Sequence, residues 1–286
     1  MLSYRHKFHA GNFADVLKHL VLVRVLRYLT RKDKALCYVD THAGAGGYLL
    51  QDPQAQKTLE FTNGIAKLWT RDDLPEALVD YRALVRAFND SNDLERYPGS
   101  PWLAARLLRR SDRLCLFEAH STDSALLQAA FADQRNVRVT IGDGFQGCIG
   151  LMPPLERRGL VLMDPSYELK TDYQAVVDTL LKAHRRFASG VYAIWYPVVE
   201  RTRIEGLERA LIASGIRRVQ LFELGIRSDS RGYGMTACGM LVINPPWGLR
   251  DEMELLLAYL ANVLGEAGEG HYRIRELVGD QAGPAH

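Results

Sequence analysis

Apolar residues recur along this chain with two alternating spacings. Helical spacing begins at Asn12, which resembles a capping box with Asp15, and continues to about residue 31. A short apolar run over 35–40 then ends in Asp40 and leads into a glycine-rich stretch over 41–48. This order predicts a long helix, then a buried parallel strand that leads into a tight loop.

From residue 98 the same two spacings alternate regularly. Helices are predicted over 101–110, 122–132, 171–187, 203–214 and 250–265, and strands over 113–117, 137–141, 159–163, 190–195, 216–224 and 238–243. Strands that alternate with helices predict an α/β fold built on a mostly parallel, doubly wound sheet.

The segment over 51–97 interrupts this alternation. It carries two predicted helices, around 59–69 and 75–88, and no strand pattern. We therefore expect one main domain formed by 1–50 and 98–267, with 51–97 inserted as a small helical subdomain. The Gly-rich and polar tail over 268–286 is expected to be loosely held.

Composition narrows the class of protein. The 286 residues are 47% hydrophobic and 24% charged, which favours a packed core over disorder. Every apolar run is shorter than the roughly 18 residues of a membrane span, and Asp15 and Lys18 fall where a signal peptide would be apolar. The cysteines are widely separated, which favours reduced thiols in a cytoplasm over a zinc ribbon or disulfide scaffold. They stand at positions 37, 115, 148 and 238.

The net charge of +2 is unevenly distributed. The first 34 residues carry eight Lys/Arg against two Asp, and the rest of the chain has a small acidic excess. Such a basic head suits a polyanionic partner. A solvated helix face explains the same charges, and from charge alone it is the simpler interpretation.

Ligands of such sheets bind beyond the carboxyl ends of the strands, so the residues that follow each apolar run are the candidates. The first such stretch, Asp40–Gly47, lacks the GxGxxG pattern that opens a helix and the GK[ST] ending of a phosphate loop, which weighs against NAD and ATP. Its glycines, Gly44 and Gly46 among them, allow close backbone approach. The D-x-x-x-G-x-G-G pattern resembles motif I of S-adenosylmethionine-dependent methyltransferases.

Two further strand ends carry acids. Glu118 ends the second strand, where a carboxylate can accept hydrogen bonds from both ribose hydroxyls of a nucleoside cofactor. Asp143 and Gly144 end the third strand, where methyltransferases often contact the cofactor's adenine. An exposed strand end and an ordinary Asp-Gly turn explain these residues as well.

The fourth strand runs into Asp164-Pro165-Ser166-Tyr167. This sequence resembles motif IV of amino-group methyltransferases, with Ser166 in place of a second proline, which predicts a less rigid loop. Asp164 and the Pro165 carbonyl can each accept an N–H of an adenine amine, so that its lone pair points at a methyl donor and the carboxylate takes the proton. Tyr167 is expected to stack on the extruded base.

A second stretch, Asn244-Pro245-Pro246-Trp247, fits the motif IV consensus better than Asp164–Tyr167. It follows the last predicted strand, at the expected edge of the sheet, after the fourth-strand position is already occupied. We therefore expect a structural turn there.

The N-terminal blocks Tyr4–Asn12 and Asp15–His19 add the most specific signal. Together with the motifs above and the stretch Tyr97–Pro101, they make the chain resemble the bacterial 23S ribosomal RNA adenine-N6 methyltransferases of the RlmJ (YhiR) type. The resemblance implies a Rossmann-like class I methyltransferase domain with a helical insertion. It also implies S-adenosylmethionine as cofactor and methylation of adenine 2030 of 23S rRNA at N6.

The resemblance also assigns residues. It places Glu118 at the ribose, Asp164 beside both cofactor and target amine, and Tyr4 against the RNA. The other residues expected in the cofactor pocket, including the two loop glycines, are Lys18, His19, His42, Gly44, Gly46, Ser100, Asp143 and Gly144.

The N-terminal arm offers further RNA contacts. Arg5, His6, Lys7 and His9 suit phosphates or bases, although an arm folded onto its own domain explains each of them singly. The histidines lack a neighbouring Cys or an HExxH spacing, so we expect no metal. We expect protein-free or early-assembly 23S rRNA as the partner, with no membrane and no obligate protein partner.

Two alternatives remain open from the sequence. One is a DNA adenine-N6 methyltransferase, because motif IV is shared with such enzymes. The other is a non-catalytic RNA-binding or ribosome-assembly protein on a degenerate methyltransferase fold, which Ser166 alone supports.

Overall fold

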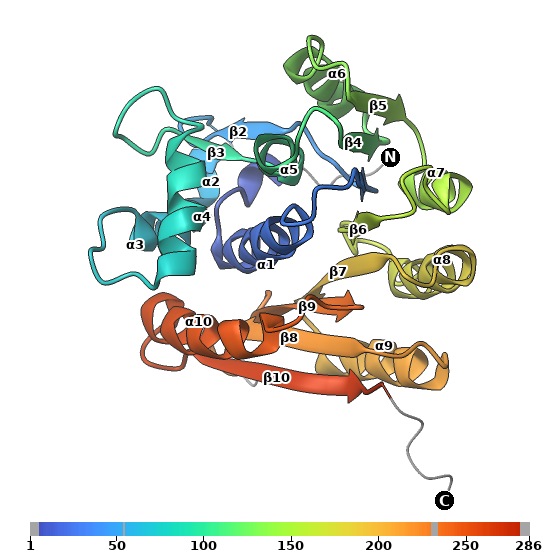
Figure 1. Cartoon of the computed structure of the whole chain (residues 1–286). Helices are drawn as coiled ribbons and strands as arrows, with labels where there is room; N and C mark the ends of the chain where they lie inside the picture. The colour runs from blue at the N-terminus through green and yellow to red at the C-terminus, as the bar shows by residue number, and fades with distance from the viewer. Residues whose placement is uncertain (1–5, 54, 230–233, 281–286) are drawn as a thin grey trace, which may run out of the picture.

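The computed structural model describes residues 6–53, 55–229 and 234–280 of the chain. It is built on an eight-stranded sheet in the order β10-β8-β9-β7-β6-β1-β4-β5 (Figure 1). The strands from β5 to β7 pair in parallel, whereas β9 and β10 run antiparallel to their neighbours. The bounds are β1 Cys37–Asp40, β4 Arg113–Glu118, β5 Val137–Ile141, β6 Gly159–Met163, β7 Val191–Val198, β8 Val219–Gly225, β9 Ala237–Ile243 and β10 His271–Val278.

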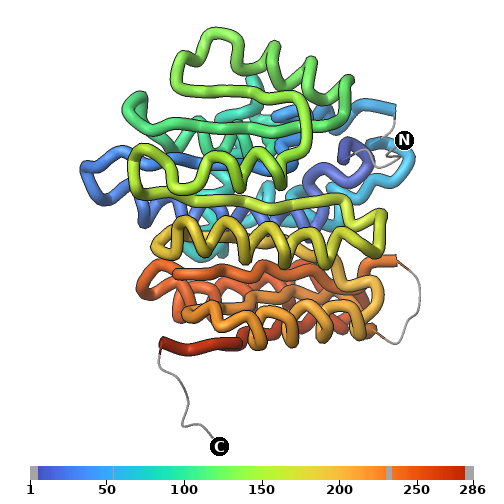
Figure 2. Tube along the Cα trace, turned by 90° about the vertical axis from the view of Figure 1, so that its right-hand side faces the viewer, coloured from blue at the N-terminus to red at the C-terminus, as the bar shows by residue number. Residues whose placement is uncertain are grey.

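Helices cover both faces of the sheet. Figure 1 shows α1, α5 and α10 on one face, and α7, α8 and α9 on the other; in Figure 2 the latter three lie one below another. This arrangement confirms the predicted α/β fold with a mostly parallel, doubly wound sheet. The bounds are α1 Phe13–Leu29, α5 Ser100–Leu107, α6 Ser121–Ala130, α7 Gly144–Leu151, α8 Asp172–Arg186, α9 Arg201–Ala213 and α10 Leu249–Leu264.

Helix α1 is buried on nearly all sides. Its N-cap is Asn12, whose side chain accepts from the backbone N–H groups of Ala14 and Asp15, as the sequence predicts. The return bond of a capping box is replaced, because the Asp15 carboxylate accepts from the N–H of Gly11 at 2.9 Å. The helix lies between the sheet and the insertion, so that its polar residues Asp15, Lys18 and His19 are also buried.

The insertion lies outside α1, farther from the sheet (Figure 1). The predicted helix over 59–69 is interrupted at Gly64, where the backbone of Gly11 approaches so closely that an added Cβ would lie 2.1 Å from its carbonyl oxygen. The expectation of no strand in the insertion is wrong, because β3 pairs with β2 and closes its base. The elements are β2 Gly47–Leu49, α2 Ala55–Thr58, η2 Glu60–Asn63, α3 Ile65–Trp69, α4 Glu76–Arg86 and β3 Arg96–Pro98.

The expectation of a loosely held tail is wrong for residues 271–278. They form β10, which pairs with β8, and Arg273 donates hydrogen bonds to the carboxylates of Glu208 and Glu223. Glu223 is 2% exposed and also accepts from Tyr196 at 2.9 Å and from Arg201 at 2.8 Å. A buried carboxylate with several charged donors thus fastens this last strand to the sheet.

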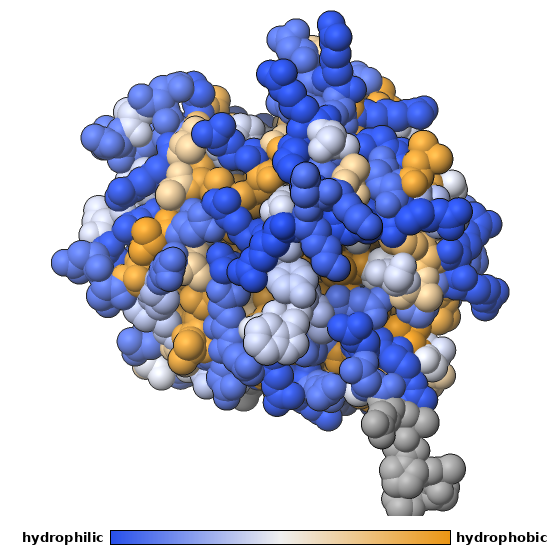
Figure 3. Space-filling view, in the orientation of Figure 1, coloured by the Kyte–Doolittle hydropathy of each residue, from blue (hydrophilic) through white to orange (hydrophobic). Residues whose placement is uncertain are grey.

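The basic N-terminal segment does not form one surface. Arg24 and Arg27 both pair with Asp80 of the insertion. Arg31, Lys32 and Lys34 precede β1 and so lie at the amino end of this strand, away from the carboxyl strand ends. Hydrophilic residues are spread over the face in Figure 3. No helix of the described chain is long and apolar enough to cross a membrane.

We predict that Glu223→Ala lowers the free energy of unfolding by about 3 kcal/mol, because it removes the buried carboxylate that Arg201, Arg273 and Tyr196 share and leaves each arginine with one fewer charged partner. The measurement is urea unfolding. The control is Glu205→Ala, whose ion pair with Arg209 is exposed and whose loss is expected to cost less than about 0.5 kcal/mol. Equal effects of the two substitutions would contradict a stabilising role for the buried network.

Candidate active site

Most of the predicted cofactor residues surround one cavity at the carboxyl ends of β1, β4 and β6. A second cavity of about 270 Å³ adjoins it and shares Lys18, Asp164 and Ser166 as lining residues. The predicted residues that line the first cavity are His6, Lys18, His19, His42, Gly44, Ser100, Glu118, Asp164 and Pro165. Three residues predicted to bind the cofactor, Gly46, Asp143 and Gly144, lie outside that lining.

The centre of the site is a network of ionisable side chains. The Lys18 ammonium lies 2.6 Å from Asp164 Oδ2 and 2.8 Å from Asp15 Oδ1. Asp15 Oδ2 in turn lies 2.9 Å from His6 Nε2. Helix α1 is thereby tied to the end of β6 on one side and to the N-terminal arm on the other.

Burial and the neighbouring charges shift the pKa values of Lys18, Asp15 and Asp164 in opposite directions. Burial opposes the ammonium of Lys18, but Asp15 and Asp164 outweigh it and hold the Lys18 pKa well above its usual value. Burial also opposes the charge of Asp15, yet His6 and Lys18 keep its pKa well below the usual value. For Asp164, burial outweighs Lys18, so its pKa is raised. Asp164 is therefore a stronger base than an exposed aspartate.

The glycine loop is fixed by Glu118. Gly44 has a φ of +61° and donates its N–H to Glu118 Oε2 at 2.8 Å, while the N–H of His120 reaches Oε1 at 2.7 Å. Burial raises the pKa of Glu118. Each carboxylate oxygen can accept more than one hydrogen bond, so both retain capacity for a pair of hydroxyl donors.

The acid that opens the glycine stretch has a structural role. Asp40 is fully buried and accepts from the hydroxyls of Tyr38 and Ser100, each at 2.7 Å. Burial raises the pKa of Asp40 to about 6. The Ser100 hydroxyl therefore joins the start of α5 to the end of β1, beside the cavity that Ser100 also lines.

Two histidines of the cavity are neutral. Burial lowers the pKa of His19 to about 3 and that of His42 to about 4. His19 Nδ1 lies 2.8 Å from the hydroxyl of Tyr97, which lies 2.6 Å from that of Tyr81 in the insertion. Uncharged imidazoles at these positions place no positive charge against a cationic ligand.

Asp143 and Gly144 have local structural explanations. Asp143 is exposed and caps α7, because its Oδ1 accepts from the N–H groups of Phe145 and Gln146. A Cβ on Gly144 would lie 1.9 Å from the carbonyl oxygen of Thr41, so packing alone requires a glycine there. Their contact with a cofactor adenine stays a prediction.

Tyr167 is held firmly in the second cavity. Its backbone has a φ of +54°, and its hydroxyl donates to the carbonyl of Trp195 at 2.6 Å. Its ring centroid lies 4.5 Å from that of Tyr173. These contacts hold the loop in which Ser166 replaces a proline.

Asp15, Tyr173 and Trp195 were not predicted as parts of this site. The available signal for Asp15 was an acid three residues before Lys18 on an apolar helix.

The competing motif, Asn244–Trp247, lies at the opposite ends of the strands from Asp164. Strand β9 is antiparallel to β7 and pairs Ile243 with Tyr192, so its carboxyl end lies at the amino end of β7. There Asn244 donates from its amide to the carbonyls of Ala188 and Gly190. A structural turn at Asn244–Trp247 is confirmed, although β9 lies between β7 and β8 and not at the predicted sheet edge.

The N-terminal arm is partly attached to the insertion. Tyr4 and Arg5 lie outside the described residues. Lys7 lies 3.8 Å from Asp52, and His9 lies 2.9 Å from Glu60, whose hydrogen bond raises the His9 pKa. Among the residues that the structure describes, no group of three or more His, Cys, Asp or Glu side chains is placed to hold a metal.

Known sequences decide the family. A family described as "Ribosomal RNA large subunit methyltransferase D, RlmJ" has a sequence model that matches residues 33–278. The chain belongs to this family. The Ribosomal RNA large subunit methyltransferase J of Escherichia coli K12 is 49% identical over 97% of this chain and 99% of its own length. The protein of the same name from Haemophilus influenzae is 47% identical over 96% of this chain and 98% of its own length.

A solved structure agrees with the fold of this family member. A crystal structure of a Legionella pneumophila protein has a TM-score of 0.89 and 38% identity, and the match covers 96% of this chain and 99% of that one. The resemblance to RlmJ-type enzymes is thus confirmed, and the chain is a large-subunit ribosomal RNA methyltransferase by family.

We predict that Lys18→Met destabilises the protein in a pH-dependent way. Without the ammonium, the pKa of Asp164 in the folded protein, which burial already raises, rises further above that in the unfolded chain, and the pKa of Asp15 rises as well. Folding then takes up protons, so the free energy of unfolding falls as pH rises. We expect a loss of about 3–5 kcal/mol near pH 8 that shrinks toward pH 4.

The measurement is denaturant unfolding at both pH values. Lys182→Met is the control, because Lys182 is exposed on α8. This substitution is expected to change the free energy of unfolding little, and equally at both pH values. A Lys18→Met effect that is equal at pH 4 and pH 8 would show that the ammonium is not needed to balance the two carboxylates.

Proposed function

We propose that this family member transfers the methyl group of S-adenosylmethionine to the N6 amine of one adenine in 23S rRNA. The observation that supports this most strongly is the position of Asp164 and Pro165. They follow β6 at the junction of the two cavities, within reach of the glycine loop on one side and of an aromatic recess on the other.

The chemistry of the first cavity fits this cofactor. Glu118 retains acceptor capacity for ribose hydroxyls, and the backbone of Gly44 lines the wall without a side chain. His19 and His42 are neutral, so neither repels a sulfonium ion. When bound, S-adenosylmethionine supplies an electrophilic methyl group, and these residues hold and orient it.

The second cavity fits an extruded adenine. Tyr167, Tyr173 and Trp195 supply its aromatic wall, beside Asp164. Lys18 occupies Asp164 Oδ2, so we assign the amine N–H to Oδ1 and the second N–H to the Pro165 carbonyl. With both hydrogens held, the nitrogen lone pair points toward the methyl donor. Asp164 then takes the proton, which its raised pKa favours.

The substrate class rests on the relatives. Their names state large-subunit ribosomal RNA, which favours RNA over the alternative of DNA adenine. The finer assignment to adenine 2030 rests on the resemblance of the motifs. Unpaired bases are the usual targets of specific RNA recognition, so protein-free or early-assembly 23S rRNA suits such a site. The bacterial relatives are named as ribosomal RNA methyltransferases, which supports the cytoplasm as the place where this protein acts.

We predict that the purified protein forms N6-methyladenosine in protein-free 23S rRNA and that Asp164→Ala lowers the rate at least about 100-fold, because it removes the proton acceptor. The measurement is transfer of labelled methyl, followed by identification of the nucleoside. The matched control is Asn244→Gly in the competing motif, where the φ of +52° suits glycine.

The control is expected to keep its activity per folded molecule. An active Asp164→Ala variant, or an inactive Asn244→Gly variant that is folded, would overturn the assignment of the catalytic motif. Label in DNA instead of RNA would favour the DNA alternative.

We predict that S-adenosylmethionine stabilises the protein by about 2.7 kcal/mol at a concentration of 100 times its Kd. Glu118→Gln is expected to weaken this stabilisation, because the amide supplies fewer acceptor sites for the ribose. The measurement is the shift in Tm with added cofactor. A wild-type protein with no shift would favour the non-catalytic alternative.

A further inference from the structure

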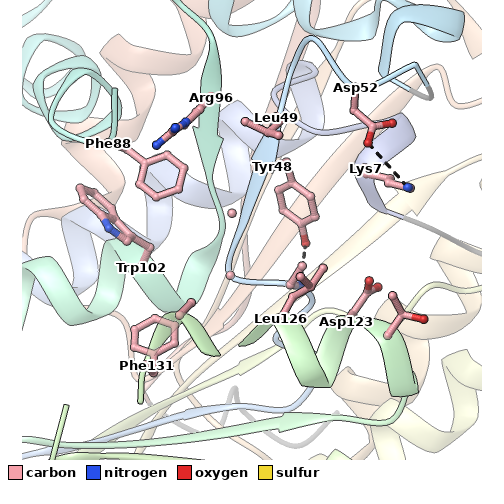
Figure 4. A pocket seen from close by; sticks show the side chains of 15 residues that line it. Lys7, Tyr48, Leu49, Asp52, Phe88, Arg96, Trp102, Asp123, Leu126 and Phe131 are labelled. Carbon is pink, nitrogen blue, oxygen red and sulfur yellow. Dashed lines mark hydrogen bonds and ion pairs between the residues drawn. The ribbon is translucent and has the colours of Figure 1, made fainter. Parts of the chain in front are cut away.

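A third cavity, of about 400 Å³, is lined by residues of β2, α5 and α6 and by Phe88, which follows α4. We call it the aromatic cavity. Its wall is largely apolar, and the proposed function uses none of the side chains that form it. These side chains are Leu49, Phe88, Trp102, Leu126 and Phe131 (Figure 4).

One side of this cavity is aromatic. Figure 4 shows Phe88, Trp102 and Phe131 together on that side. The ring centroids of Phe88 and Trp102 are 4.9 Å apart, with an edge-to-face angle of 64°. Phe88 also covers Gly47 so closely that an added Cβ would lie 2.3 Å from the ring. The aromatic side is thus built on backbone that carries no side chain.

The rim of the aromatic cavity is polar and carries both charges. Lys7 and Asp52 form an ion pair on the side opposite the aromatic rings (Figure 4). Arg96 lies at the rim with its side chain 45% exposed and 3.1 Å from Asp90, and Asp123 supplies a further carboxylate. An apolar, aromatic side with hydrogen-bond donors and acceptors around it complements a nucleobase, which has apolar faces and polar edges.

The aromatic cavity is also next to the reaction site. Tyr48 and Asp123 line both this cavity and the first cavity, which is proposed to hold the cofactor and is called the cofactor cavity below. The short helix η1, His6–Phe8, connects them from the arm: His6 lines the two cavities around Asp164, while Lys7 lines the aromatic one. The aromatic cavity therefore adjoins the cofactor cavity and, through the neighbouring residues His6 and Lys7, lies near the cavity proposed for the target adenine.

We propose that the aromatic cavity binds a second unpaired base of the same RNA strand that carries the target adenine. The inference rests on the proposed function, since it takes the substrate to be that RNA. Binding a second base fixes the register of the strand, so this cavity selects which adenine reaches Asp164.

The test fills the cavity from its exposed side. Leu126 is 54% exposed on α6 and lines the cavity, so Leu126→Trp leaves the core intact and places an indole in the cavity. The matched control is Leu255→Trp on α10, where the native leucine is 74% exposed and lies outside the cavity lining. The affinity of each variant is measured, at one fixed salt concentration, for a 23S rRNA fragment that carries the target adenine.

We expect Leu126→Trp to weaken RNA binding about 10-fold or more, in the range that loss of one stacked base gives. Leu255→Trp is expected to bind as the wild type does. The Tm shift with S-adenosylmethionine is expected to be unchanged in both variants.

A series of RNAs with single abasic sites identifies the occupant. One abasic position other than the target is expected to weaken binding to the wild type and to have no further effect on Leu126→Trp. Equal RNA affinities of Leu126→Trp and the wild type, an abasic profile that the substitution leaves unchanged, or a lost cofactor shift would each overturn the proposal.

RNA affinity tests the aromatic cavity separately from the reaction. If the wild type binds the RNA through this cavity but transfers no methyl group, the proposed function fails and the second-base site stands. If methyl transfer occurs and Leu126→Trp binds the RNA normally, the proposed function stands and the second-base site fails.

Discussion

The ammonium of Lys18, enclosed between the carboxylates of Asp15 and Asp164, is the interaction on which the site depends. Taking a charged lysine out of water is costly, and the cost is offset only if its partners are close and themselves charged. The distances of 2.6 and 2.8 Å meet this demand. They also require that α1 be set at one rotation against the sheet, because only one face of the helix points to β6.

That requirement explains why α1 is so deeply buried. The sheet lies on one side of it, while the insertion covers the other. The contact from His19 through Tyr97 to Tyr81 carries the influence of the insertion to the cofactor cavity. The insertion is therefore part of what positions the site, since α1 would otherwise be an apolar helix exposed to water.

The features that sequence reasoning predicted well are local ones. A strand pattern that ends in an acid identified Glu118 and Asp164, because the period of apolar residues and the residue that follows it are both written in a few consecutive positions. The position of Lys18 between Asp15 and Asp164 was not predicted, since Lys18 and Asp164 are 146 residues apart and no local pattern shows that they meet.

Short and edge elements were the features missed. Strands of three residues, such as β3, carry too little periodicity to be distinguished from a loop. Strand β10 is half-exposed and is held by Arg273 and buried Glu223, so its sequence resembles a polar tail. Asp143 and Gly144 match a cofactor motif, and capping and packing also account for both residue types, so their contact with a cofactor stays a prediction.

A crystal structure with S-adenosylmethionine and an adenosine nucleotide tests the account most directly. The account predicts the ribose of the cofactor against Glu118 and the target N6 beside Asp164 Oδ1 and the Pro165 carbonyl. It also predicts the methyl carbon about 3–3.5 Å from that nitrogen in a reactive arrangement. A cofactor bound in the aromatic cavity, or an adenine amine held away from Asp164, would contradict it.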